Sequence, residues 1–145
     1  MFESMKKREK GQTLTEFALV ATVFLLLIFS IMQMANAIYA YNTICSAAQA
    51  AVRYGVVHPP ASTSSSDVSS ASSAVQTQAI QAAPGLNSSN LTVNVSWPTD
   101  AQNSNDQDAK VQISYNYTVS IPFMSSVTLP LTTTSQMMVS QNPGS

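Results

Sequence analysis

The chain has 145 residues, the length of one modest domain plus a further segment. Only 9% of the residues are charged and the formal net charge is -1. This balance lacks the basic surface that nucleic-acid-binding proteins use, so we expect no nucleic-acid partner. The charges are unevenly placed, because residues 17–52 contain none. Four of the six basic residues precede that stretch: Lys6, Lys7, Arg8 and Lys10.

The first predicted element is an apolar run from Phe17 to Tyr39. It is long enough to span a bilayer, which needs about 20 mostly apolar residues. Its first half has no polar face, unlike the core helix of a soluble protein. We therefore predict a transmembrane helix. The basic cluster ahead of it favours a cytoplasmic N-terminus and export of the rest of the chain.

The helical pattern continues beyond the apolar run. Apolar residues recur at spacings of three and four: Ile38, Tyr41, Ile44, Cys45, Ala48, Ala51 and Val52. Polar residues fall on the opposite face: Asn42, Ser46, Gln49 and Arg53. Gly55 is a suitable helix end and Pro59-Pro60 prevents continuation. We predict one helix from about Thr13 to Tyr54, whose second half carries an apolar stripe that needs a partner.

Residues 62–85 are rich in serine and alanine, a composition that also suits a flexible linker. Their apolar residues share one helical face: Val68, Ala71, Val75, Ala79 and Ala82 or Ala83. Ser66 or Asp67 can cap the start, and Pro84-Gly85 can end the segment. We predict a short helix whose small residues allow close packing on the long helix.

Beyond Gly85 the apolar period changes to two, which is typical of strands. We predict strands over residues 91–97, over 110–121 with Ile113 and Tyr115 on the apolar face and Pro122 at the end, and from about Leu131 to Val139. Residues 98–109 are predicted to form a polar loop. The expected fold is α+β, with the long and short helices packed on a small antiparallel sheet of about three strands.

The residue inventory offers little for catalysis. His58 is the only histidine and precedes two prolines, so we interpret it as an exposed loop residue. Cys45 is the only cysteine, so no intramolecular disulfide forms, and we expect it to be buried in the helix. One histidine and one cysteine do not make a typical zinc site, and no nucleophile-elbow pattern surrounds any serine. We predict no enzyme, no metal and no cofactor, with a small hydrolase as the alternative.

Two further sets of residues carry weak signals. Asp100, Asp106 and Asp108 share the predicted loop, but their spacing lacks the glycine and terminal glutamate of an EF-hand, so we interpret them as solvated carboxylates rather than calcium ligands. The sequence also holds four N-x-S/T sequons, which matter only in a cell that glycosylates exported chains. Their asparagines are Asn87, Asn90, Asn94 and Asn116.

Two kinds of processing fit the N-terminus. A basic region, an apolar run and the Ala35–Ala37 triplet would suit a secretory signal peptide cut after Ala37. However, such an apolar region usually has only about 7–15 residues. A secretory signal also leaves unexplained why Glu16 stands at the start of the run.

The stretch KKREKGQTLTEFALV, at residues 6–20, resembles a class III type IV prepilin signal. Such a signal is a short basic leader ending in glycine, cut before the apolar run, with Glu followed by Phe or Tyr at the fifth mature position. Gly11, Gln12 and the pair Glu16-Phe17 match these positions. Residues 16–55 are similar to the N-terminal helix of the TadE-like minor pilins of tight-adherence pilus systems, although Thr22 stands near where that family often has a proline.

The resemblance implies cleavage between Gly11 and Gln12 by a prepilin peptidase. It implies a leader of residues 1–11, a transmembrane and filament-core helix of residues 12–39, and an exported domain of residues 40–145. The protein would sit in the cytoplasmic membrane, or enter the pilus, and would bind other pilin subunits through this helix. A major filament subunit and an exported soluble binding protein cut after Ala37 are the alternatives.

For Glu16, the resemblance implies pairing with the α-amino group of a neighbouring, newly added subunit. After cleavage, the local sequence offers no other cation within one turn than the new amine of Gln12 itself, four residues away. The alternative is that Glu16 is only a recognition mark for the peptidase.

Overall fold

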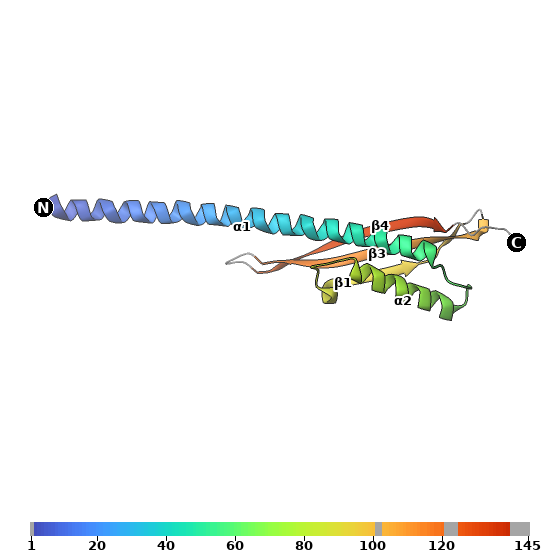
Figure 1. Cartoon of the computed structure of the whole chain (residues 1–145). Helices are drawn as coiled ribbons and strands as arrows, with labels where there is room; N and C mark the ends of the chain where they lie inside the picture. Colours follow the sequence, from blue (N-terminus) through green and yellow to red (C-terminus); the bar gives the residue numbers. More distant parts are fainter. Residues whose placement is uncertain (1, 101–102, 121–124, 140–145) are drawn as a thin grey trace.

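The computed structural model describes the backbone of residues 2–100, 103–120 and 125–139, and the side chains of residues 11–98, 108–120 and 125–139. The elements are two helices, α1 (Phe2–Val57) and α2 (Ser65–Gln81), a 3-10 helix η1 (Ser88–Asn90), and four strands: β1 (Leu91–Ser96), β2 (Thr99–Asp100), β3 (Asn103–Val119) and β4 (Val127–Val139). The C-terminal part of α1 lies along the sheet and the N-terminal part extends beyond it as a rod (Figure 1). The predicted α+β order of elements is confirmed.

Helix α1 is longer than predicted at both ends. It begins before Gly11 and runs through Gly55 to Val57, so the prediction that Gly55 ends the helix is wrong. Gly55 is buried in the last turns, where a Cβ would meet Trp97 Cη2 at 3.3 Å and Val75 Cγ2 at 3.4 Å. Glycine stands here because the helix, α2 and β1 approach one another closely.

The sheet is built around β3, which is both the longest strand and the central one. It pairs antiparallel with β1 on one side and with β4 on the other. The register places Ile113 between Val93 of β1 and Thr133 of β4. Because side chains alternate between the two faces of a strand, this row and its neighbours two residues away form one inward face.

Two of the predicted strand limits were wrong. The predicted loop 98–109 contains strand residues, because β2 pairs with the start of β3, with Thr99 opposite Gln107. Strand β4 begins at Val127, before the predicted Leu131. Its Pro130 lies opposite Asn116 and is tolerated because β4 is an edge strand that pairs only with β3 in the described part of the chain. Strand β3 ends at Val119, and the predicted end at residues 121–122 lies outside the described residues.

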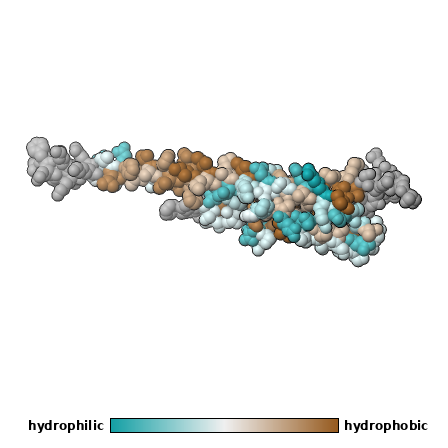
Figure 2. Space-filling view, viewed as in Figure 1, coloured by the Kyte–Doolittle hydropathy of each residue, from teal (hydrophilic) through white to brown (hydrophobic). Residues whose placement is uncertain are grey.

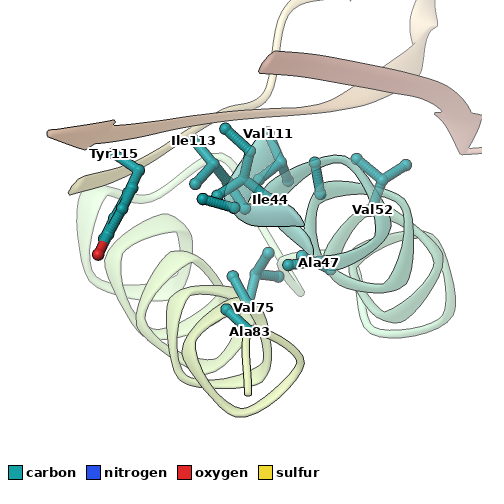
Figure 3. Packing of buried hydrophobic residues seen from close by; sticks show 12 residues of the cluster. Ile44, Ala47, Val52, Val75, Ala83, Val111, Ile113 and Tyr115 are labelled. Carbon is teal, nitrogen blue, oxygen red and sulfur yellow. The ribbon is translucent and has the colours of Figure 1, made fainter. Parts of the chain in front are cut away.

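The core lies between the C-terminal part of α1, α2 and the inward face of the sheet (Figure 3). Its buried residues come from all three layers: Ile44, Ala47, Ala48, Ala51 and Val52 of α1, Val75 and Ala79 of α2, and Val111, Ile113 and Tyr115 of β3. The alanines let the two helices and the sheet pack closely. Ile38 and Tyr41 were predicted to share this stripe, but they are 51% and 46% exposed. The sheet and α2 cover a narrower sector of α1 than the apolar pattern suggested.

The predicted short helix is confirmed as α2, with Val75 and Ala79 on its buried face. Its N-cap residue is Ser64, not Ser66 or Asp67 as predicted. Instead, the Asp67 carboxylate accepts a hydrogen bond of 2.5 Å from the Ser62 hydroxyl. The chain then turns through Gly85, whose φ of 79° is in the left-handed region that favours glycine.

Candidate functional site

The part of α1 ahead of the domain is an exposed apolar rod (Figure 2). From Gly11 to Tyr39 every side chain is exposed except those of Ala21, Gln33 and Ala37, which are partly exposed. Among the described residues, Gly11–Val57 is long and apolar enough to be a candidate membrane span, and its most apolar window is not buried. Complete transfer of a large apolar side chain from water to an apolar environment is favourable by about 1.5–3 kcal/mol. This surface therefore favours lipid or other apolar helices.

Gly11 and Gly55 occupy the same helix for different physical reasons. A Cβ on Gly11 would meet nothing within 4 Å, so no contact with described residues requires a glycine there. Glycine in a helix interior is nevertheless about 1 kcal/mol less favourable than alanine. Gly55 offsets this disadvantage by close packing, whereas Gly11 does not.

The predicted recognition residues lie in the first exposed turns of the candidate span. Gln12 and Glu16 are four residues apart in α1 and so share one face of the helix. The Thr15 hydroxyl donates to the Gln12 carbonyl oxygen at 2.8 Å, and Phe17 is 72% exposed. Glu16 is exposed and forms no ion pair with any side chain that the structure describes. Both the carboxylate and the aromatic ring are thus accessible to another protein.

A contact between the apolar run and the sheet was not predicted from the sequence. The Tyr117 hydroxyl donates to Gln33 Oε1 at 3.0 Å, and Gln33 Nε2 donates to the Ser120 carbonyl oxygen at 3.2 Å. The signal that could have found this contact is the amide itself, because a polar group amid apolar surroundings needs a hydrogen-bond partner.

The remaining candidate residues do not form a catalytic or metal site in the described part of the chain. His58 is exposed as predicted, and its ring stacks on Tyr54 with centroids 4.4 Å apart. Cys45 is half-buried rather than buried, and its thiol donates to the Thr133 hydroxyl at 3.5 Å. No group of three potential metal ligands occurs among the described residues.

Asp108 was predicted to be a solvated loop carboxylate, and this is wrong. It is buried in β3, where its Oδ2 accepts a hydrogen bond from Gln136 Nε2 at 2.6 Å and its Oδ1 has no partner among the described residues. The reason is that Asp108 belongs to β3, which begins at Asn103, and so does not project into water from a loop. The side chains of Asp100 and Asp106 lie outside the described residues.

Residues 11–53 match the family described as TadE-like protein. The chain therefore carries a TadE-like segment. That family is a structural and assembly family associated with Tad pilus systems and is not typically enzymatic. No curated protein and no solved structure matches the chain. The TadE-like segment covers the exposed apolar half of α1 and most of its packed half, while α2 and the sheet lie outside it.

Proposed function

We propose that this chain is a minor-pilin-like component of a Tad pilus, anchored in the cytoplasmic membrane by the apolar part of α1. The observation that carries the proposal is the coincidence of the TadE-like segment with an apolar helix that the domain leaves uncovered. Residues 12–39 form the membrane and filament-core helix, and residues 40–145 form the exported domain. The basic cluster of residues 6–10 keeps the N-terminus in the cytoplasm.

In this proposal a prepilin peptidase cuts between Gly11 and Gln12. Support comes from Gly11, which is exposed and has no packing role among the described residues. The cut leaves the apolar helix on the mature protein. A helix without a polar face is equally suited to lipid and to a bundle of similar helices, so packing and polar contacts decide where it resides.

The proposed polar contact is made by Glu16. In a staggered bundle, its carboxylate pairs with the Gln12 α-amino group of a neighbouring subunit, which is one of the proposed pilin partners. Leaving one such charge unpaired inside an apolar bundle costs about 3–5 kcal/mol, enough to fix the register of assembly. The exposure of Glu16 leaves the carboxylate available for this pairing.

The mature N-terminus tests the processing step. Mass spectrometry of the protein purified from a cell with the cognate pilus system should give a chain beginning at Gln12. A mature start at Ile38 would contradict the proposal and support an exported soluble protein. A reporter enzyme fused after Ser145, active only outside the cytoplasm, tests the topology in the same cells, and its activity in the cytoplasm would exclude the proposed orientation.

Substitution of Glu16 separates pairing from peptidase recognition. Glu16→Leu should still be cut after Gly11 and inserted, but should no longer co-purify with partner subunits or support piliation. Thr15→Leu is a matched control, because it makes a similar polar-to-apolar change one residue away on another face of α1. Loss of cleavage alone in Glu16→Leu would assign Glu16 to recognition by the peptidase.

A further inference from the structure

The exported domain has an uncharged end that points along α1 toward the candidate span. Residues 111–145 contain no charged residue, and neither do residues 17–52. Every charged residue after Glu16 falls within residues 53–110. Strands β3 and β4 extend back along α1, past the point where α2 and β1 stop (Figure 1). The part of the domain nearest the apolar rod therefore lacks the side chains whose immersion in lipid is most unfavourable.

A groove of about 280 Å³ lies between α1 and this end of the hairpin. Leu26 and Phe29 line it on the helix, and Val119 and Leu129 line it on the strands. Leu129 is 42% exposed and Val127, two residues earlier on β4, is 49% exposed. One face of the described hairpin end thus presents the aliphatic side chains of Val119, Val127 and Leu129, whereas the other face carries the exposed polar side chains of Thr118 and Thr128.

The groove is held in place by the two hydrogen bonds of Gln33. Tyr117 and Ser120 of the hairpin both bond to this one side chain, so the hairpin end is fixed at the level of Gln33 on the helix. These bonds also satisfy the amide of Gln33 inside the chain. An amide satisfied in this way is compatible with an apolar environment, where an unpaired one is not.

The length of the apolar run shows where this level falls in a membrane. From Phe17 to Gln33, α1 rises about 24 Å at 1.5 Å per residue, whereas a hydrocarbon core is about 30 Å thick. A span that starts earlier would immerse Glu16. A span that starts at Phe17 must include helix beyond Gln33, and that part stands beside the hairpin. The same arithmetic leaves a shortfall of about 6 Å at Gln33 and about 12 Å at Phe29, so the groove lies in the outer half of the hydrocarbon core.

We infer that the hairpin end marked by Val119, Val127 and Leu129 enters the outer half of the hydrocarbon core, where lipid acyl chains fill the groove. The inference rests on the proposed membrane anchoring. Lipid is the occupant because the length shortfall exists in a single chain, before any partner subunit is present. The domain is then attached to the membrane at two points and is held at a fixed depth and orientation.

The test is depth-dependent quenching in the full chain, reconstituted in vesicles of phosphatidylethanolamine and phosphatidylglycerol. In a Cys45→Ser background, single cysteines at Leu129, Thr134 and Val23 carry an environment-sensitive fluorophore. Quenching uses a lipid with a nitroxide high on its acyl chain, and iodide reports exposure to water. Thr134 is the matched control, exposed on the same strand roughly 16 Å farther from the hairpin end.

Lipid quenching at Leu129→Cys should exceed that at Thr134→Cys by about twofold or more, and iodide should show the reverse order. Val127→Cys repeats the test if Leu129→Cys does not fold. Quenching at Val23→Cys but not at Leu129→Cys would overturn the inference and leave the anchoring intact. Absence of lipid quenching at Val23→Cys would overturn both. A Leu129→Cys label shielded from both quenchers would assign the groove to a second copy and overturn the inference.

Discussion

The two halves of α1 share one uninterrupted backbone but have opposite surroundings. From Gly11 to Tyr39 the helix carries large apolar side chains on all sides and is exposed, whereas from Ala40 to Val57 small apolar residues form one buried stripe. The second half keeps a polar face, with Gln49 and Arg53 exposed. The comparison teaches that the distribution of size and polarity around a helix, rather than its apolar content, decides whether it packs on its own domain.

The largest expected effect on stability comes from replacing an isoleucine by alanine in each half of α1. Ile44→Ala should lower the free energy of unfolding by about 2–5 kcal/mol, because Ile44 is fully buried and its removal leaves a cavity. Ile31→Ala, where the side chain is 61% exposed, should change it by less than about 0.5 kcal/mol. Denaturation in detergent, followed by the fluorescence of Trp97, measures both. Equal losses would mean that the two halves do not differ as described.

A smaller effect is expected from enlarging the two glycines. Gly55→Val should destabilise the domain by about 1–3 kcal/mol, because the new side chain meets Trp97, Val75 and Ala109. Gly11→Val should leave the unfolding of the domain unchanged, because nothing lies within 4 Å. Thermal melting of the full chain in detergent measures both variants. A Gly55→Val protein with an unaltered melting temperature would show that the close approach at this helix end is not needed.

Gln33 is the residue of the apolar half that bonds to the domain, and its contribution to the free energy of unfolding should be smaller again. Gln33→Leu removes the partner of the Tyr117 hydroxyl and should destabilise the domain by about 0.5–1.5 kcal/mol. Gln49→Leu is the control, since Gln49 is exposed on the polar face of the same helix. Chemical denaturation gives the free energy of unfolding of both variants. Equal values would show that the Gln33 hydrogen bonds do not stabilise the position of the hairpin.

The smallest effect concerns the carboxylate of Asp67 in the domain. The apolar run of α1 has no charged residue with which to compare it. Hydrogen bonds from Ser62 and then Ser64 lower the pKa of Asp67 below its ordinary 3.8. This contribution to stability is therefore fully present above pH 3.8 and is lost as the pH falls through the lowered pKa. An NMR titration should show the pKa of Asp67 rising in Ser62→Ala. Ser69→Ala, whose hydroxyl bonds to Ser66 instead, should leave it unchanged.

The sequence predicted those elements whose side chains repeat with a clear period. The face of Ile113 and Tyr115 is buried as expected, and so are Val75 and Ala79 of the predicted α2 stripe, because burial on one side imposes the period. The hairpin of β2 with β3 was missed because residues 98–109 are mostly polar and show no alternation of apolar and polar residues, although their backbone pairs. The start of β4 was missed because Pro130 usually marks the end of a strand, and edge position was not visible in the sequence.

For the candidate site, the sequence alone supplied Gly11, Gln12, Glu16 and Phe17 through a local motif, and the fold adds only that they are exposed. The Gln33 contact could not be derived in the same way. It joins residues 84 positions apart in the chain, and it depends on how far β3 extends along α1. Local patterns identify segments, whereas the distance that one element reaches along another is a property of the assembled fold.

The continuity of α1 also fixes an angle. The 24 residue steps from Glu16 to Ala40, the first buried residue of the core, correspond to about 6.7 helical turns. The domain therefore leaves the rod about 240° around the axis from the carboxylate, and each inserted or deleted residue would turn it by about 100°. In an assembly of parallel helices joined through Glu16, this phase determines which neighbour each domain faces. The length of the apolar run thus determines the direction in which the domain projects around the helix axis, in addition to matching the thickness of a membrane.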